Sequence, residues 1–566
     1  MTNGFIKGQI FNWLPKSIPT GEPKSACDAL RLQRNIDPAA KYDIELDPLF
    51  ALIEEMAPRV AALVQPDTRA FINSDYDVDG IVSGLVWKRL ISFLGGSCQL
   101  FIPNRFRDSY GVNFERIRLE HSKNAFDLLV CLDRGATVGD ELSLLAHELK
   151  IEVLVIEHHT PKLVSAKRDL VCEINPHNFP GIDPLEYCSA VISVLMYEAV
   201  IDYCGGNDLG ARCELRVLAG LAVFADVVSV KGLTARAVAR FALDHALDPE
   251  SNPGLRSLIR QRCDTSFGLT SGDMCFRICP VLNAAGRLES ADLAIELLST
   301  RCQGEHQALV RRLIELNAKR QTLQAEIEAQ ARKRAGDGAN VLLEFGPWHH
   351  GVVGPAAGRL SEQLGIPVML GGPDANLKAY AFSGRSRCGT DLISTLDRAS
   401  AGLNIQYGGH KSAVGARVSF DRAEAVIAEL RSRLLAACPG RVERQTRWFD
   451  LALRPGSVAI ETLNTLRSLE PFGPENETPI FLVPGVHLRQ AESSRSPGDA
   501  SGIALFRCPL GQEHRFATAV YNHPALAGSR DEPCALIGSL MHEAFEGRSF
   551  VRFKIEDIVT ESDARA

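Results

Sequence analysis

SDYDVDGIVSG, residues 74–84, is the stretch that decides the fold of this chain. It places three carboxylates on alternate residues, Asp75, Asp77 and Asp79, directly after the apolar run 70–72. An apolar segment at helical spacing follows. This order predicts a strand, an acidic loop and a helix. Open α/β sheets bind ligands in such loops, and alternating carboxylates bind hard divalent cations.

The same stretch has two other interpretations. An EF-hand loop also begins D-x-D-x-D-G, but it needs a bidentate Glu at its twelfth position, which here is Val86. A helix should also precede an EF-hand loop, whereas a strand-like run precedes this one. A solvated acidic turn is the other alternative, although three acids this close together repel one another unless a cation neutralises them.

The bulk composition bounds the class of protein. A chain of 566 residues can form three or four domains, and its 45% hydrophobic and 23% charged residues are ordinary for a globular protein. The net charge of −7 means that a nucleic-acid site must be a local basic groove. The 15 cysteines contain no C-x-x-C pair, which argues against structural zinc and suits a reducing compartment. Without a signal peptide or a long apolar run, we expect a cytoplasmic protein with no membrane contact.

Two further apolar runs end in candidate metal ligands. Residues 126–132 are nearly all apolar, as in a buried parallel strand, and Asp133 follows them. Residues 151–156 repeat the pattern and are followed by EHH at 157–159. A lone histidine is usually a core or surface residue. Two adjacent histidines behind an acid, at the end of a strand, indicate a site.

Asp226 lies inside the very apolar stretch 217–230. A carboxylate buried there is costly unless it is paired, for example with Arg236, or bound to a metal. Together the four segments predict one dinuclear centre, with two cations about 3.5–4 Å apart and a shared carboxylate. Such a pair activates water and stabilises the attacking and leaving oxygens of a phosphoryl displacement. Oxygen and imidazole ligands without thiolates favour manganese or magnesium.

A series of short motifs runs through the chain in order. They are DYDVDG (75–80), PNR…YG (103–111), the strand end at Asp133, EHH (157–159), the Asp226 segment, PVLNAAGRL (280–288), WHHGVVG (348–354), SGRS (383–386), YGGHKSAVG (407–415) and LEPFGPENETPIF (469–481). Together they resemble the motifs of the DHH phosphoesterase family and, within it, of the RecJ branch of single-strand-specific 5′→3′ DNA exonucleases. The resemblance extends from about residue 67 to the C-terminus.

The resemblance implies roles for the candidate residues. The implied metal ligands are Asp75, Asp77, Asp79, Asp133, His158 and Asp226. The first two loop acids and Asp133 would hold one cation, while the third loop acid, Asp133, His158 and Asp226 would hold the other. Asp133 would bridge the two cations, and His159 would contact the scissile phosphate. These last two are the implied catalytic residues.

The resemblance also implies contacts with nucleic acid. The implied phosphate-binding residues are Arg105, Arg287, His349, Ser383, Arg385 and His410, and the 5′ end of the strand would lie against Ser383 and Arg385. Taken alone, the loop that carries Arg105 is equally an ordinary surface loop. The sequence departs from the family at Glu157, where an Asp is usual, and at Arg134, where an Asn is usual. We interpret Glu157 as orienting a histidine, a role that matters about 10–100-fold.

The rest of the chain predicts an α/β protein of several parts. The expected parts are an N-terminal segment (1–45), a parallel-sheet DHH catalytic domain (46–302), a long connecting helix (303–338), a smaller α/β DHH-associated domain (339–438) and an OB-like β-barrel (439–566). In the smaller domain, a helix would begin near Pro355 after an anion-binding glycine loop, and SGRS would form a second loop. The barrel is predicted from five short alternating strands, at 485–492, 502–507, 514–520, 534–540 and 549–558.

The expected function is metal-dependent hydrolysis of single-stranded DNA from its 5′ end, in DNA repair and recombination. The expected cofactors are two Mn²⁺ or Mg²⁺ ions. The resemblance implies single-stranded DNA, a RecQ-type helicase and a single-strand-binding protein as partners of a monomer. One alternative is a DHH phosphodiesterase of short oligonucleotides or cyclic dinucleotides, against which residues 440–566 argue. A silent single-strand-binding protein is the other. Glu157 and Arg134 motivate it, and the intact set of ligand-type residues argues against it.

Overall fold

The computed structural model describes most of the chain. The described residues are 2–6, 9–16, 30, 34, 47–108, 111–161, 171–334, 340–387, 389–403, 405–437, 444–454, 457–458, 460–487, 491–493, 504–506, 516–519, 533–545 and 548–560. Contacts divide the chain into a larger unit, residues 42–263 with 271–441, and a smaller one, residues 1–41 and 264–270 with 442–566. In the described ranges, no helix has both the length and the apolar composition needed to cross a membrane.

A parallel five-stranded sheet forms the centre of the first lobe of the larger unit, in the order β4-β3-β5-β6-β7. Its strands are β3 Arg69–Ser74, β4 Ser97–Phe101, β5 Leu128–Leu132, β6 Glu152–Ile156 and β7 Val171–Ile174. Every side chain of β5 is buried, and β3 and β6 expose only their first residue. This burial explains the unbroken apolar runs. Since β3, β5 and β6 are parallel neighbours, their carboxyl ends share one edge of the sheet.

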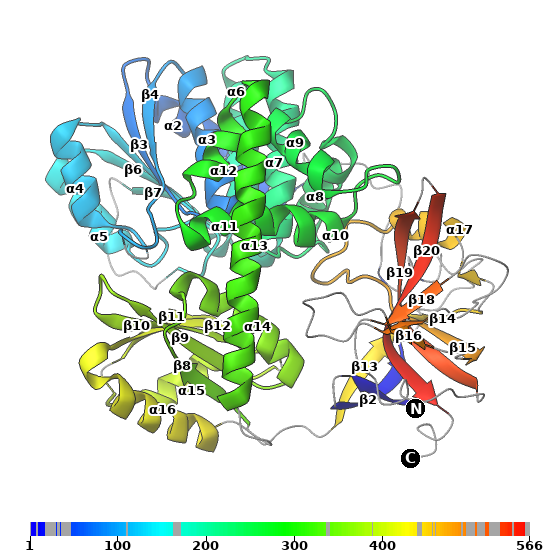
Figure 1. The fold of residues 1–566 in the computed structure, drawn as a ribbon. Helices are drawn as coiled ribbons and strands as arrows, with labels where there is room; N and C mark the ends of the chain where they lie inside the picture. The colour runs from blue at the N-terminus through cyan, green and yellow to red at the C-terminus, as the bar shows by residue number, and fades with distance from the viewer. Residues whose placement is uncertain are drawn as a thin grey trace. The chain divides into compact units, whose positions relative to one another are not determined.

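Helices flank this sheet on both sides, and further helices extend the lobe beyond it (Figure 1). The larger ones are α2 Pro48–Leu63, α3 Val78–Phe93, α4 Phe114–Lys123, α5 Gly139–Leu149, α6 Ser189–Tyr203, α7 Leu209–Ala225, α8 Leu233–His245 and α9 Pro253–Arg262. Shorter ones are η2 Pro176–Asn178, η3 Pro184–Glu186, α10 Ser271–Asp273, the π-helical η4 Met274–Ile278, α11 Cys279–Leu288 and α12 Asp292–Ser299. Helix α6 is buried from Ser189 to Ile201, which agrees with its mostly apolar sequence on every face.

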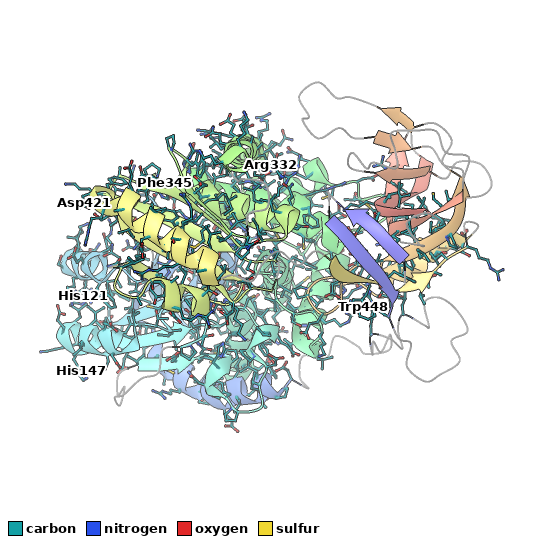
Figure 2. All side chains as sticks on the ribbon, turned by 90° about the horizontal axis from the view of Figure 1, so that it is seen from below. His121, His147, Arg332, Phe345, Asp421 and Trp448 are labelled. Atoms are coloured by element: carbon teal, nitrogen blue, oxygen red, sulfur yellow. The ribbon has the colours of Figure 1, made fainter. Side chains whose placement is uncertain are left out.

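One long helix, α13 Gln303–Arg334, runs from the first lobe to the second (Figure 1). It packs on α9, α11 and α12 of the first lobe and on α14 of the second. Ile327 and Ala331, near its end, belong to the apolar core of the second lobe. In Figure 2, Arg332 marks this end of the helix and Phe345 marks the neighbouring sheet.

The second lobe holds a five-stranded sheet in the order β11-β12-β10-β9-β8. Its elements are β8 Leu342–Phe345, α14 His350–Leu364, β9 Val368–Asp374, β10 Ala379–Arg385, α15 Leu392–Ala399, β11 Gln406–Gly409, β12 Ala413–Ser419, η5 Phe420–Arg422 and α16 Ala423–Ala437. Two predictions are wrong here. Helix α14 begins at His350, with Pro355 inside it, because one proline removes one hydrogen bond and does not stop the helix. SGRS is not a loop, since Ser383–Arg385 pair with β9 and β12.

The smaller unit contains a five-stranded sheet in the order β14-β15-β19-β20-β18. Its elements are β1 Thr2–Ile6, β2 Gln9–Pro15, β13 Arg444–Phe449, β14 Leu451–Ala452, α17 Ile460–Arg467, β15 Phe481–His487, β16 Ala491–Ser493, β17 Ala504–Phe506, β18 Phe516–Ala519, β19 Pro533–Phe545 and β20 Arg548–Thr560. The prediction of five short strands needs correction. Strands β19 and β20 have 13 residues each, because their antiparallel pairing continues past the apolar pattern. The predicted strand 485–492 is two strands.

The N-terminal segment contributes to this smaller unit. Strand β2 pairs with β1 and, in parallel, with β13. Leu30 is fully buried in the same apolar cluster as Phe481 and Phe553. Phe267 packs against that cluster and stacks on His542, with 4.2 Å between ring centroids. Three distant parts of the sequence therefore build one core.

Candidate metal centre

Asp75 and Asp77 lie in the turn between β3 and α3. The side chain of Asp77 caps α3 by accepting a hydrogen bond from the Gly80 N–H at 3.2 Å. Oδ1 of Asp75 accepts hydrogen bonds from the Tyr76 N–H, at 2.8 Å, and from the Arg134 guanidinium. A Cβ atom at Gly80 would lie 2.4 Å from the Asp75 carbonyl oxygen, so this tight turn requires glycine.

Asp79 is buried in the first turn of α3. It accepts hydrogen bonds from the N–H groups of Ser189, at 2.9 Å, and Ala190, at 2.8 Å. These donors form the N-terminus of α6, where the helix dipole favours a negative charge. The third acid of the loop is thereby fixed at the edge of the sheet.

Asp133 follows β5 with a φ of 57°, in the left-handed region that Asp tolerates. Its Oδ1 lies 3.4 Å from the Ser189 hydroxyl, 3.2 Å from His158 Nε2 and 3.7 Å from His159 Nδ1. The backbone turn therefore directs this carboxylate towards the start of α6 and towards the two histidines that follow β6.

Glu157 holds the two histidines that follow β6. Its Oε2 accepts from the N–H groups of His158, at 2.9 Å, and His159, at 3.0 Å, and lies 2.8 Å from His159 Nδ1. Burial alone raises the pKa of Glu157, but the hydrogen bond and charge of His159 lower it to about 2. Burial alone lowers the pKa of His159, but Glu157 raises it to about 9. Glu157 therefore stabilises the protonated form of the His159 imidazole.

Asp226 differs from the other candidate ligands because it follows helix α7 and not a strand of the sheet or the loop after one. It is the residue that caps the C-terminus of helix α7, and its Oδ2 lies 3.5 Å from His158 Nε2. The alternative partner Arg236 donates from Nη1 to the Val230 carbonyl at 3.4 Å. Val227, the next residue, has a φ of 59°, an unusual conformation for a β-branched side chain.

These side chains form three overlapping groups in which the ligand atoms lie within 4.8 Å of one another. The groups are Asp75 with Asp77 and Asp133, Asp79 with His158 and Asp226, and Asp133 with His158 and His159. His158 Nε2 is buried and, although carboxylate oxygens of Asp133 and Asp226 lie 3.2 and 3.5 Å away, it makes no hydrogen bond among the described residues. A buried nitrogen without a partner is costly, and a cation between these carboxylates would satisfy it. The oxygen and imidazole set suits Mn²⁺ or Mg²⁺.

The titration of the metal-free carboxylates leads to the same conclusion. Burial, together with the charges of Asp79, Asp77 and Asp75, raises the pKa of Asp133 well above its ordinary value. Burial and the charges of Asp79 and Asp77 do the same to the pKa of Asp226. Several carboxylates that cannot all ionise together form a site that divalent cations would neutralise.

A basic cluster adjoins this edge. The guanidinium of Arg105 lies over the Tyr76 ring, 4.3 Å from its centroid. Arg287 lies in the last turn of α11, and burial together with the charge of Arg105 lowers its pKa to about 10. Burial and the charges of His350, Lys319 and Arg105 lower the pKa of His349 to about 4. Burial is the larger cause of both shifts, and the neighbouring positive charges add to it, so this cluster is a partly desolvated, positively charged region in which His349 is neutral at pH 7.

The second lobe approaches the metal-binding edge through this cluster. A Cβ atom at Gly286 would lie 2.7 Å from the Tyr76 carbonyl oxygen, and one at Gly351 would lie 2.1 Å from the Arg287 carbonyl oxygen. The two glycines therefore allow the acidic loop, α11 and α14 to pack backbone against backbone. This close packing, rather than an anion-binding loop, explains the glycine at 351.

Ser383, Arg385 and His410 lie on strands or turns of the second lobe. Arg385 Nη1 donates to the Ser383 hydroxyl at 3.1 Å. Gly354 of α14 faces both, since a Cβ there would lie 3.0 Å from Ser383 Oγ and 3.4 Å from Arg385 Nη2. The ring of His410 stacks on that of His159, with 6.2 Å between centroids and 8° between planes. His410 therefore lies beside His159 of the first lobe, whereas Ser383 and Arg385 contact each other and helix α14.

Sequence reasoning missed several residues that build the site. Ser189 donates to both Asp79 and Asp133. Asn283 accepts from the Val78 N–H at 3.0 Å and so fixes the start of α3. Both lie inside largely apolar stretches, where an isolated polar residue is the signal that could have identified them; Ser189 is buried and Asn283 is partly buried.

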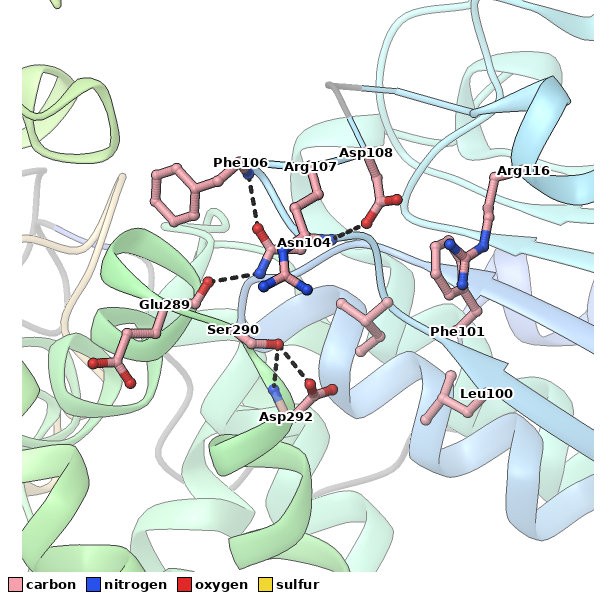
Figure 3. Close-up of a pocket in the computed structure, with 11 residues that line it drawn as sticks. Leu100, Phe101, Asn104, Phe106, Arg107, Asp108, Arg116, Glu289, Ser290 and Asp292 are labelled. Atoms are coloured by element: carbon pink, nitrogen blue, oxygen red, sulfur yellow. Dashed lines mark hydrogen bonds between the residues drawn. The ribbon is translucent and has the colours of Figure 1, made fainter. Parts of the chain in front are cut away.

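A pocket of about 830 Å³ lies beside the carboxyl end of β4 (Figure 3). Arg107, Asp108, Glu289 and Asp292 line it, and the Asn104 side-chain N–H donates to the Glu289 carbonyl at 2.9 Å. No carboxylate or histidine of the three groups belongs to its lining. Charges of both signs give the pocket no consistent attraction for phosphate, so we place the candidate centre at the sheet edge.

Comparison with known proteins identifies three family segments in the chain. The chain matches models for the DHH family N-terminal domain at residues 69–204, the DHHA1 domain at 338–436 and the RecJ OB domain at 449–557. It is 31% identical to the single-stranded-DNA-specific exonuclease RecJ of Thermus thermophilus over 81% of this chain and 66% of that protein. With the RecJ of Dickeya dadantii, the identity is 29% over 83% of this chain and 84% of that protein.

Solved structures agree. The crystal structure of RecJ from Thermus thermophilus in complex with Mn²⁺ matches 94% of this chain and 75% of that chain, with a TM-score of 0.77 and 26% identity. A crystal structure of exonuclease RecJ bound to manganese matches 69% of this chain and 96% of that one, with a TM-score of 0.58 and 30% identity. The chain therefore belongs to the DHH family and, within it, to the RecJ proteins.

Proposed function

We propose that this protein is a metal-dependent 5′→3′ exonuclease that hydrolyses phosphodiester bonds of single-stranded DNA, in DNA repair and recombination. The observation that carries the proposal is the set of three overlapping ligand groups. Asp133 belongs to two of these groups, and so does His158, whose buried Nε2 makes no hydrogen bond among the described residues. The names of the relatives supply the substrate class. The larger and the smaller unit together contain all three family segments.

In this proposal the chain holds two Mn²⁺ or Mg²⁺ ions. Asp75, Asp77 and Asp133 would hold one, and Asp79, Asp133, His158 and Asp226 the other. When bound, the pair would lower the pKa of a water molecule and stabilise charge on the phosphoryl oxygens. His159, protonated and held by Glu157, would donate to an oxygen of the scissile phosphate.

The basic cluster would position the strand. Arg105, Arg287 and His349 would contact backbone phosphates beside the acidic loop. Ser383 and Arg385 would bind the 5′-terminal phosphate, with His410 between them and the metal edge. A terminal phosphate held on the second lobe would place one bond of the strand over the carboxylates. This arrangement supports removal of nucleotides from the 5′ end.

A strand labelled at its 3′ end and carrying a 5′ phosphate tests the proposal. With Mn²⁺, we expect a descending ladder on single-stranded DNA, little cleavage of a blunt duplex, and no cleavage by the Asp133→Ala protein. A 20-mer should be degraded at least as well as a dinucleotide. Preference for dinucleotides would favour the short-oligonucleotide phosphodiesterase. Tight binding of the strand without cleavage would favour a silent binding protein.

We further propose that the protein acts as a cytoplasmic monomer with a RecQ-type helicase and a single-strand-binding protein. This part of the proposal rests on the family resemblance alone. Light scattering during gel filtration would test the monomer, and co-purification with each partner would test the assembly.

A further inference from the structure

Arg134 is a buried cation beside the candidate metal centre. Its side chain is 4% exposed, and it forms an ion pair with Oδ1 of Asp75. A second donor of the same guanidinium reaches the Gly111 carbonyl at 2.8 Å. Its Nε is buried without a hydrogen-bond partner among the described residues. The two contacts fix the guanidinium where Asp75, Asp77 and Asp133 converge.

Oδ1 of Asp75 is already occupied by two donors, Arg134 and the Tyr76 N–H. Only Oδ2 remains to bind a cation, so Asp75 cannot bind one in bidentate fashion. The guanidinium also reduces the charge of the Asp75–Asp77–Asp133 group from three negative charges to two. A divalent cation bound by this group would be repelled by the positive charge of Arg134, because only the Asp75 carboxylate would lie between them.

We propose that Arg134 is a positioning residue that acts as a fixed internal cation, weakening divalent-cation binding by the Asp75–Asp77–Asp133 group. The inference rests on the proposed function, because it assumes that this group holds one of the two cations. The expected effect on the dissociation constant is about tenfold or more, the size that neighbours of metal ligands commonly produce. The metal concentration that the enzyme requires is therefore set by a residue that does not bind the metal.

The test is a Mn²⁺ titration of the full chain, followed by the electron paramagnetic resonance signal of free Mn²⁺ and by calorimetry. Asp77→Asn identifies the step that belongs to the Asp75–Asp77–Asp133 group, and Asp226→Asn identifies the other step. We expect Arg134→Asn to lower the Mn²⁺ dissociation constant of the Asp75–Asp77–Asp133 step about tenfold or more. The dissociation constant of the step that involves Asp226 should change less than about threefold. No change in either step, or an equal change in both, would overturn the proposal.

Three further variants separate charge from folding. Arg134→Gln keeps an N–H donor for the Gly111 carbonyl and should behave as Arg134→Asn. Arg134→Lys keeps the charge and should bind Mn²⁺ as the unchanged protein does; tighter binding by this variant would contradict a charge effect. Arg118→Asn removes an exposed charge that pairs with Glu148 on the surface, and should change neither step.

The titration contains no DNA, so its result is independent of the nuclease assay. If the Mn²⁺ dissociation constants change as expected but the protein cleaves no single strand, the proposed function is refuted and the inference about Arg134 stands. A protein that cleaves single strands but whose Mn²⁺ constants do not depend on Arg134 would refute the inference alone.

Discussion

Asp133 has the central position in the candidate centre because its carboxylate belongs to two of the three ligand groups. Replacing it with Asn keeps the shape but removes the charge that both cations would share. We expect Asp133→Asn to reduce cleavage of single strands about 10²–10³-fold or more and to weaken both Mn²⁺ steps. Asp140→Asn, an exposed acid in the first turn of α5, is the matched control and should retain activity.

Glu157 acts through His159, whose Nδ1 it contacts at 2.8 Å. Glu157→Gln removes the charge that keeps this imidazole protonated and should lower kcat about 10–100-fold. Binding of the strand should change much less, since Glu157 is buried beneath the histidines. Glu157→Asp should restore most of kcat. A parallel loss of strand binding in Glu157→Gln would instead show that the local fold depends on this carboxylate.

Arg385 provides the clearest test of strand polarity. It donates to the Ser383 hydroxyl and lies against Gly354 and Gly358 of α14, where the proposal places a terminal phosphate. Arg385→Ala should raise KM about tenfold or more for a strand with a 5′ phosphate and much less for a strand with a 5′ hydroxyl. Arg398→Ala, an exposed arginine in the last turn of α15, is the control. An equal effect on both strands would place the 5′ end elsewhere.

At the scale of elements, the junction between α11 and α14 brings the two lobes together. Gly351→Ala would place a Cβ 2.1 Å from the Arg287 carbonyl oxygen, so the backbones would have to separate. We expect it to destabilise the larger unit by about 1–3 kcal/mol and to lower activity. Gly358→Ala lies in the same helix, where its Cβ would contact only Arg385 Cγ at 3.8 Å, and should be neutral or stabilising. Urea denaturation of both variants is the measurement.

At the scale of the molecule, the two units have separate cores and one of them contains the candidate centre. Calorimetry should therefore show two transitions, and Mn²⁺ should raise only the one that belongs to residues 42–263 and 271–441. At 100 times its dissociation constant, one ion should stabilise that unit by about 2.7 kcal/mol. A chelator should reverse the shift. Movement of both transitions together would show that the units unfold as one.

The effect of Mn²⁺ on this unit should depend on pH. Without metal, the pKa values of Asp133 and Asp226 are higher in the folded protein than in the unfolded chain. As pH rises above about 4, these two carboxyl groups therefore lose their protons in the unfolded chain before they do so in the folded protein. Each carboxyl therefore reduces stability increasingly as pH approaches its folded pKa. A bound cation removes this loss, so we expect a larger Mn²⁺ shift at pH 8 than at pH 5.5.

Much of this protein is determined by its sequence. Parallel buried strands require continuous apolar runs, and a metal site at their ends requires acids and histidines, so 70–79, 126–133 and 151–159 predict both the sheet and the centre. Helix α13 was likewise predictable from a long stretch without glycine or proline. Family resemblance added the OB-like barrel, which short alternating strands alone indicate only weakly.

Tertiary structure decided what no local pattern contains. Leu30, Phe267 and Phe553 share one core although more than 200 residues separate each from the next, because burial of apolar surface does not depend on sequence distance. Helix α14 begins before Pro355 because its tertiary packing, including the close approach of Gly351 to the Arg287 carbonyl, offsets the one hydrogen bond that the proline removes. The pairing of Arg134 with Asp75, 59 residues apart, likewise exists only in the folded chain, where the ends of β3 and β5 become neighbours.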